Sequence, residues 1–258
     1  MRCLVLGGTG FIGSAICDRL INEGHRVRIL ARHISPTTRS TRIPGSVDLI
    51  CGDFLNYQDL RLALRGIDVV FHLISTTVPK TANDDPIFDV QTNLIGTLGL
   101  LEALKNEGVG RIIFASSGGT VYGIPHYLPI DEHHQTNPLG AYGITKLAIE
   151  KHLKLLSQSK VISVIILRVS NPYGTGQKVH NGQGVIRIFL QRILSEQPVE
   201  IWGDGEIVRD YIYVSDVAEA FVRAMEYAGG HTTFNVGSGK GLSLNSLATS
   251  AMIDACAL

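Results

Sequence analysis

A glycine-rich turn behind the first apolar run constrains the fold of this chain more than any other feature. Residues 3–6 read Cys-Leu-Val-Leu and lead directly into Gly-Gly-Thr-Gly-Phe-Ile-Gly at positions 7–13. The apolar run predicts a buried strand, and the residues after the turn predict a helix. Glycine permits positive φ angles and close approach of a pyrophosphate, while a helix N-terminus offers free N–H groups. This strand–turn–helix context predicts a dinucleotide site at Gly7, Gly10 and Gly13 rather than a merely structural turn.

Short apolar runs alternate with amphipathic stretches along the first two thirds of the chain. Most runs are nearly continuous in aliphatic residues, as expected for parallel strands that are covered on both faces. The predicted strands are residues 3–6, 27–30, 47–51, 69–73, 112–115 and 161–167, and the predicted helices are residues 11–22, 58–64, 86–106 and 142–157. This order predicts an α/β fold, a Rossmann-type doubly wound parallel sheet.

The pattern changes at about Pro172, where turns rich in Gly, Asn and Gln begin. Further predicted elements are a helix at 184–195, strands at 199–202 and 211–214, and a helix at 217–227 that Asp216 is expected to cap. We therefore expect a dinucleotide-binding domain at residues 1–171 and a smaller substrate lobe at residues 172–258.

Composition argues against several classes of partner. Lys and Arg number 23 and so do Asp and Glu, so the formal net charge is zero and neither a nucleic-acid surface nor a polybasic membrane patch is indicated. The 4 cysteines and 9 histidines form no metal-ligand pattern, so no metal is expected. The N-terminal apolar run is too short for a signal peptide, and no run reaches membrane-span length, which favours the cytoplasm.

The ends of the second and third predicted strands bear on the choice of cofactor. NAD-binding folds usually place an acidic residue after the second strand to bind the ribose 2′-OH, but this chain has Ala31 and Arg32. Arg32 either favours the 2′-phosphate of NADP or is a solvent-facing loop residue. Asp53 is placed either to contact an adenine or to form a local turn before the next helix.

Tyr142 and Lys146 are four residues apart in a predicted helix and so lie on one face, about one turn apart. A fixed cation favours the phenolate form of a nearby tyrosine, which can accept a proton. Such a pair alone occurs by chance in many helices. Here, however, a buried strand upstream ends in the hydroxyl groups of Ser116, Ser117 and Thr120, at the edge where open α/β sheets bind ligands.

These motifs resemble the extended short-chain dehydrogenase/reductase family, in its NAD-dependent epimerase/dehydratase branch. The resemblance runs from Cys3 to about Gly239. It implies that Tyr142 and Lys146 are the catalytic pair and that Asn93 supports the active-site helix. The cofactor contacts assigned with it are Gly7, Gly10, Phe11, Ile12, Gly13, Arg32, Asp53, Phe54, Leu73, Asn93, Tyr142 and Lys146.

The hydroxyl-bearing turn departs from the family pattern at one position. Ser117 is the nearest match to the catalytic serine or threonine of the family, but the usual hydroxyl position falls on Gly118, which has no side chain. Ser116 and Thr120 therefore remain alternatives to Ser117.

The same turn separates the reactions that the resemblance implies. Related sugar dehydratases carry an Asp-Glu pair before the Val-Tyr-Gly sequence, whereas this chain has Gly119 and Thr120. What remains is 4-epimerisation of a nucleotide sugar of the UDP-glucose/UDP-galactose type by transient oxidation at C4, in which Tyr142 takes the proton of the 4-OH while C4 gives hydride to a tightly bound NAD. One alternative is an NAD(P)-dependent nucleotide-sugar or carbonyl reductase. A second is a catalytically weak or inactive member of the family.

The resemblance extends to the predicted substrate lobe. It implies that Asn171 contacts the sugar diphosphate, that Arg209 pairs with phosphate and that Trp202 can stack on a pyrimidine. The alternatives are a turn residue for Asn171, an ion pair with a neighbour such as Asp210 for Arg209, and a core position for Trp202.

Two further expectations follow from the resemblance. The family continues for several elements after the Gly239 region, whereas this sequence stops after a short apolar stretch at residues 251–258, so we expect an incomplete lobe. We also expect a homodimer through the helices at residues 86–106 and 142–157.

Overall fold

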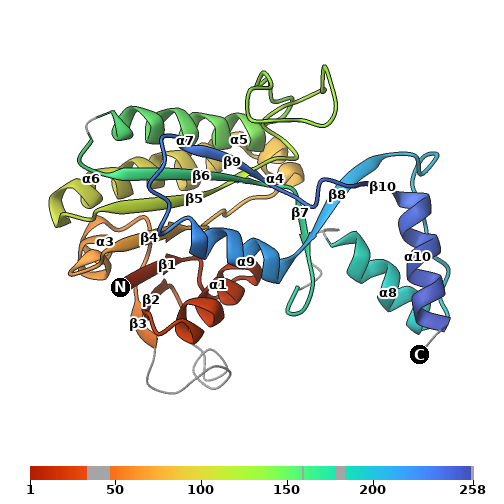
Figure 1. Cartoon of the computed structure of the whole chain (residues 1–258), viewed down its shortest axis with the longest axis horizontal. Helices are drawn as coiled ribbons and strands as arrows, with labels where there is room; N and C mark the ends of the chain where they lie inside the picture. The colour runs from red at the N-terminus through yellow and green to blue at the C-terminus, as the bar shows by residue number, and fades with distance from the viewer. Residues whose placement is uncertain (34–46, 159, 178–183, 257–258) are drawn as a thin grey trace.

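The computed structural model describes residues 1–33, 47–158, 160–177 and 184–256 (Figure 1). Within these residues, seven parallel strands form one sheet in the order β3-β2-β1-β4-β5-β6-β9. Their bounds are β1 Arg2–Leu6, β2 Arg26–Ala31, β3 Val47–Cys51, β4 Val69–His72, β5 Arg111–Ser117, β6 Ser163–Val169 and β9 Thr233–Val236. The direction of strand addition reverses between β1 and β4, which confirms the predicted doubly wound α/β sheet.

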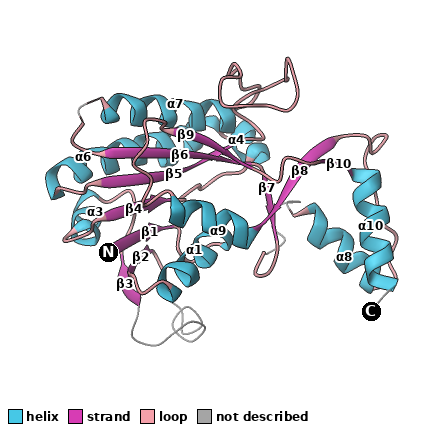
Figure 2. Ribbon diagram, viewed as in Figure 1, coloured by secondary structure: helices cyan, strands magenta, loops and turns pink. Residues whose placement is uncertain are grey.

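Helices cover both faces of this sheet (Figure 2). α1 (Phe11–Asn22) and α9 (Val214–Arg223) pack on one face, and α3 (Tyr57–Leu64), α6 (Gly96–Glu107) and α7 (Ala141–Ser157) pack on the other. Alternate residues of β1 enter the two layers, with Leu4 and Leu6 in one core and Cys3 and Val5 in the other. Because all four are fully buried, the run needs no polar position, as predicted for a central parallel strand.

The predicted helix at residues 86–106 is three successive segments. α5 (Pro86–Asp89) is followed by the π-helical segment η1 (Val90–Ile95) and then by α6. Threonine side chains bond backbone carbonyls here, since Thr92 Oγ1 donates to Phe88 O and Thr97 Oγ1 donates to Asn93 O. π-helical turns inside helices occur frequently at functional sites. A short helix not predicted from the sequence, α4 (Pro79–Asp84), precedes this unit.

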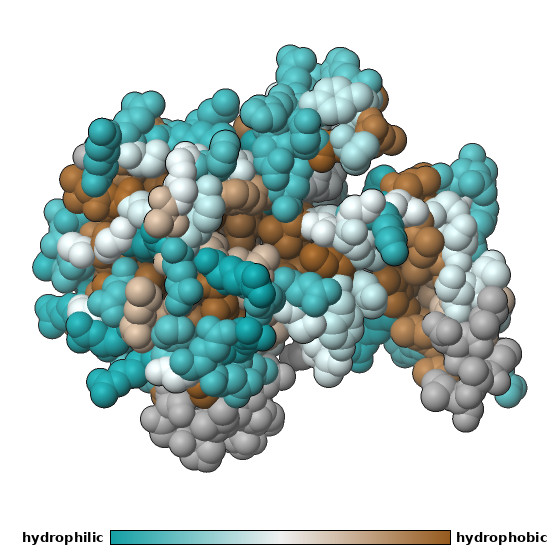
Figure 3. All heavy atoms as spheres, in the orientation of Figure 1, coloured by the Kyte–Doolittle hydropathy of each residue, from teal (hydrophilic) through white to brown (hydrophobic). Residues whose placement is uncertain are grey.

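A smaller lobe contains a three-stranded sheet and two helices. The strands are β7 (Asn171–Tyr173), β8 (Val208–Tyr213) and β10 (Gly241–Ser243), and the helices are α8 (Val185–Leu194) and α10 (Leu244–Cys256). Phe189 of α8 packs with Leu247 and Ala248 of α10, and apolar side chains gather over these helices in Figure 3. Between β8 and β10 the chain returns to the larger sheet, where it forms α9 and β9. Residues 172–258 therefore do not all lie in the lobe.

Two local predictions in this region are wrong. Residues 199–202 form no strand, and the segment that does pair is β8, because its backbone finds partners in β7 and β10. The following helix begins at Val214, so Asp216 lies inside its first turn instead of capping it. The carboxylate of Asp216 there complements the positive end of the helix dipole. No described helix has the length and apolar character needed to cross a bilayer.

Candidate active site

The glycine turn lies at the carboxyl end of β1, beside the end of β4, where the strand order reverses. Gly7 has a φ of 89°, which favours glycine, and a Cβ there would lie 3.2 Å from the carbonyl carbon of Leu73. A Cβ on Gly13 would collide with the carbonyl oxygen of Gly7. Gly10 is the N-cap of α1 and supplies no side-chain bond, so no side chain caps that N-terminus. The turn therefore has the bare backbone that a pyrophosphate needs.

The residues after β2 and β3 lie next to this turn in the sheet order. Arg32 is exposed directly after β2, and its carbonyl accepts a bond of 3.5 Å from the thiol of Cys51. Asp53 forms the local turn considered from the sequence, because its Oδ1 accepts from the backbone N–H of Leu55 at 2.9 Å. Phe54 is buried and stacks on His72 at 5.3 Å, so its ring belongs to the core. Only its backbone is free to meet a cofactor.

Lys146 is buried between α7 and β5. Its Nζ donates a hydrogen bond of 3.0 Å to the carbonyl oxygen of Ala115 and lies 5.6 Å from the centre of the Tyr142 ring. Tyr142 is half-buried, and its hydroxyl makes no hydrogen bond to any described residue. The helix therefore presents a phenol next to a fixed ammonium. The ammonium is bound to Ala115, which directly precedes Ser116 and Ser117 at the end of β5.

The three candidate hydroxyls have different surroundings. Ser116 is buried and donates a bond of 2.5 Å to Glu150 Oε1. Ser117 is half-buried, and within the described chain its Oγ has no hydrogen-bond partner. Thr120 Oγ1 is buried and also lacks a partner there. At Gly118 a Cβ would lie 3.1 Å from the carbonyl oxygen of Arg168, so the backbone of this turn packs closely on β6.

A buried ion pair behind this turn was not predicted from the sequence. Arg168 of β6 and Glu150 of α7 are joined by two hydrogen bonds, and Arg168 also donates to the hydroxyl of Tyr122 at 2.9 Å. Glu150 follows Lys146 by four residues, as Lys146 follows Tyr142. That spacing places all three side chains on one helix face and was the available signal.

His72 lies under the site at the end of β4. Thr97 Oγ1 donates to Asn93 O and therefore accepts from His72 Nε2, at 2.8 Å, which assigns the proton to that nitrogen. His72 Nδ1 is buried without a partner among the described residues. Burial, with the nearby charge of Lys146, lowers the pKa of His72 to about 3, so the imidazole is neutral.

Asn93 is fully engaged inside the protein. Its Oδ1 accepts from the backbone N–H of Thr76 at 2.9 Å, and its Nδ2 donates to Thr77 Oγ1 and Asp89 Oδ1. The side chain thus ties the loop after β4 to η1, and it has no free polar atom for a cofactor.

The lobe residues lie around β7 and β8. Asn171 Nδ2 donates to the carbonyl oxygen of Asp210 at 2.8 Å. The Asp210 carboxylate accepts from the backbone of Ser238 and Gly239, so it is not paired with Arg209. Arg209 is exposed and donates to Val208 O. The side chain of Trp202 is 85% exposed, which rules out the core position considered for it.

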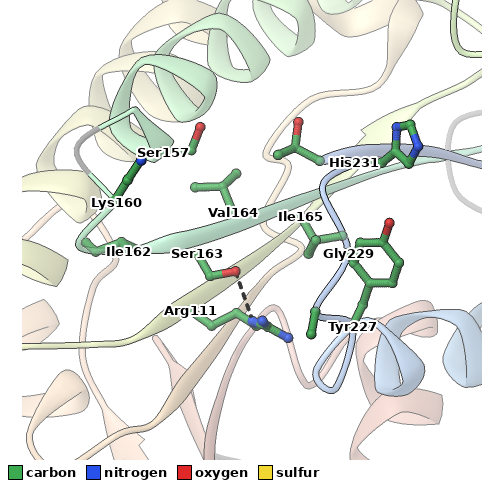
Figure 4. Close-up of a pocket in the computed structure, with 12 residues that line it drawn as sticks. Arg111, Ser157, Lys160, Ile162, Ser163, Val164, Ile165, Tyr227, Gly229 and His231 are labelled. Carbon is green, nitrogen blue, oxygen red and sulfur yellow. Dashed lines mark hydrogen bonds between the residues drawn. The ribbon is translucent and has the colours of Figure 1, made fainter.

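A surface depression lies at the opposite edge of the sheet. It is lined by Arg111, Lys160, Ser163, Tyr227 and His231 (Figure 4). Arg111 begins β5 and Ser117 ends it, so the two edges are separated by about 20 Å of strand. The depression is therefore separate from the candidate active site. No group of three or more His, Cys, Asp or Glu side chains suited to a metal occurs in the described ranges.

Fold and site together define a dinucleotide-binding α/β protein with a tyrosine–lysine pair at the carboxyl edge of its sheet. A family model described as the NAD dependent epimerase/dehydratase family matches residues 3–237. The chain belongs to that family, which confirms the resemblance seen in the sequence.

Individual relatives agree with this assignment. The chain is 38% identical over 245 residues to a putative UDP-glucose 4-epimerase of Methanocaldococcus jannaschii, which covers 95% of this chain and 79% of that protein. The UDP-glucose 4-epimerase of Thermotoga maritima with UDP-glucose has a TM-score of 0.89 at 34% identity, over 97% of this chain and 81% of that one. The Thermus thermophilus UDP-glucose 4-epimerase in complex with NAD has a TM-score of 0.88 at 34% identity, over 99% of this chain and 84% of that one.

Proposed function

We propose that this chain is a nucleotide-sugar 4-epimerase of the UDP-glucose/UDP-galactose type that uses NAD. The observation that carries the proposal is the buried ammonium of Lys146 beside the Tyr142 ring, at a strand end whose turn holds no carboxylate. Relatives matched along nearly the whole chain include UDP-glucose 4-epimerases. Because Gly119 and Thr120 stand where related dehydratases carry an acid pair, removal of water is disfavoured.

The glycine turn fits a dinucleotide, because a Cβ on Gly7 or Gly13 would crowd the backbone of Leu73 or of Gly7, so only glycine allows this tight turn at the bare N-terminus of α1. NAD held by the turn at Gly7, Gly10 and Gly13 would supply the hydride chemistry, as oxidant of the sugar C4 and then, once reduced, as reductant of the 4-keto sugar. Arg32 is exposed directly after β2, where it is free to meet the 2′-phosphate that distinguishes NADP from NAD. Mass spectrometry of the released cofactor tests directly which of the two is bound.

The proton chemistry belongs to the chain itself. Tyr142 takes the proton of the 4-OH as C4 is oxidised. It gives the proton back after the 4-keto sugar has rotated in the pocket to present its other face. Lys146 favours the phenolate form of Tyr142 by its fixed positive charge. Ser117 is proposed as the hydroxyl that binds the reacting oxygen, because Ser116 is already bound to Glu150. Thr120, whose hydroxyl is unpartnered within the described chain, is the second choice.

The smaller lobe is proposed to hold the nucleotide. Asn171 and Arg209 lie on adjacent strands β7 and β8 and are assigned to the diphosphate, while the exposed indole of Trp202 is assigned to the pyrimidine. In this proposal residues 1–171, with the returning segment 214–236, form the dinucleotide-binding domain.

A homodimer is proposed through α5, η1 and α7. Apolar side chains are exposed on all three, with Ile87 69%, Ile95 55% and Ile144 56% exposed. Light scattering after size exclusion should give twice the monomer mass for the wild type, and Ile144→Glu should reduce it.

The decisive experiment is a turnover screen with UDP, dTDP and GDP hexoses that reads product stereochemistry by NMR. Wild type should interconvert the 4-epimers without added reductant. Tyr142→Phe should lose this activity, and Tyr127→Phe, a matched change at an exposed tyrosine, should keep it. Net reduction of a carbonyl substrate, with cofactor consumed and no epimer formed, would instead establish the reductase alternative.

A further inference from the structure

Thr145 lies between Tyr142 and Lys146 in α7 and is tied to a buried carboxylate. Its Oγ1 donates a hydrogen bond of 2.5 Å to Asp89 Oδ2, in α5. The two residues are 4% and 0% exposed. Because water does not compete at such a site, this bond is worth more than a surface contact.

The other oxygen of Asp89 is also occupied. Asp89 Oδ1 accepts from Asn93 Nδ2 at 2.9 Å and from the hydroxyl of Thr77. The carboxylate thus receives hydrogen bonds from α7, from η1 and from the loop after β4. A carboxylate suits this role because both of its oxygens accept, whereas an amide has only one acceptor oxygen.

A second anchor comes from the same region. The N-cap of α7 is Gly140, which has no side chain, and the backbone N–H of Ala141 instead donates to Asn83 Oδ1 of α4 at 2.9 Å. The helices α4 and α5 both contact α7 and lie near its first turns (Figure 1). Asn83 and Asp89 therefore hold the turns of α7 that carry Tyr142.

We propose that Asp89 is a positioning residue that sets the orientation of Tyr142 and Lys146 through Thr145. The bond from Lys146 to Ala115 O ties α7 to β5 along one direction. Thr145 is the preceding residue, about 100° away around the helix, so its bond to Asp89 restrains rotation of α7 about its own axis. The proposal rests on the proposed function, because it takes Tyr142 and Lys146 as the catalytic pair.

The test compares steady-state kinetics of four variants on the epimerised UDP-hexose. Thr145→Val and Asp89→Asn should each lower kcat roughly tenfold with little change in KM, because small misplacements of a catalytic group cost rate rather than binding. Thr145→Ser, which keeps the hydroxyl, should restore kcat to within about twofold. Thr92→Val is the matched control, since Thr92 is a buried threonine of η1 whose hydrogen bonds go to Thr76 and Phe88.

The proposal is overturned if Thr145→Val keeps the wild-type kcat. It is also overturned if Thr92→Val loses as much kcat as Thr145→Val does. If Asp89→Asn fails to fold, the Thr145→Val and Thr145→Ser pair still decides it. Amide hydrogen exchange at residues 141–146 adds a readout that needs no activity: it should accelerate in Thr145→Val and not in Thr92→Val. If the wild type epimerises no nucleotide sugar, the proposed function fails. Amide hydrogen exchange still tests whether Asp89 holds α7 through Thr145, and unchanged exchange rates in Thr145→Val would refute that role.

Discussion

Arg168 Nη2 lies 2.6 Å from Glu150 Oε2, with the two side chains 3% and 0% exposed. Strand β6 and the helix that carries Tyr142 therefore share a buried ion pair. Burial acts to lower the pKa of Arg168, but its bonds to Glu150 and Tyr122 outweigh burial and hold that pKa above its ordinary value. Because Ser116 bonds the same carboxylate, the pair also shapes the turn that holds the candidate hydroxyls.

Arg168→Met should destabilise the protein by about 3–5 kcal/mol, because it leaves Glu150 buried without its cation. Urea unfolding followed by circular dichroism measures this change. The double variant Arg168→Met/Glu150→Leu should recover much of the loss, since no charge is then left unpaired. Arg223→Met, at a pair whose arginine is 80% exposed, should change stability little. Equal losses for the buried and exposed pairs would contradict this account.

Gly13→Ala should abolish cofactor binding, because the added methyl group collides with the carbonyl oxygen of Gly7 and distorts the turn. Calorimetric titration with NAD measures the loss. Gly99→Ala is the control: a Cβ there meets nothing within 4 Å, and alanine in a helix stabilises it by up to about 1 kcal/mol. It should bind NAD as the wild type does and unfold at a slightly higher temperature.

His72 should make the fold sensitive to acid. Its pKa falls from 6.5 to about 3 on folding, so the unfolded chain binds the proton more readily. The contribution of His72 to stability is thus fully present above pH 6.5 and declines as the pH falls toward 3, by up to about 1.4 kcal/mol per unit. His72→Gln should flatten the plot of unfolding free energy against pH over this window. His152→Gln, at an exposed histidine, should leave the slope as in the wild type.

Trp202 should report nucleotide binding by fluorescence, because it is the single tryptophan of the chain and is 85% exposed. Stacking on a uracil ring should quench its emission in proportion to the bound fraction when UDP is added. Trp202→Ala should weaken UDP binding about tenfold by calorimetry, since aromatic stacking on a base is worth about 1–3 kcal/mol. Saturable UDP binding without any change in emission would remove Trp202 from the site.

Prediction from the sequence succeeded where the signal is local. The predicted α1 has the observed bounds, and the predicted α7 differs by one residue, because apolar periodicity and flanking glycines act within a few turns. The π-helical turn at Asn93 was not predicted, and there Asn93 accepts from the backbone N–H of Thr76, a contact between distant segments that no local pattern encodes. The strand proposed at residues 199–202 was wrong because an apolar run pairs only where a partner strand is available.

The sequence by itself determined the alternation of strands and helices, the glycine turn and the one-turn spacing of Tyr142 and Lys146. Helix and strand periods translate such patterns directly into geometry. Only the tertiary structure decided which hydroxyl lies bound to Glu150, that β9 returns to the main sheet, and that Asp89 meets Thr145 across 56 residues. Contacts between residues so far apart depend on how whole elements pack, and no local pattern encodes that packing.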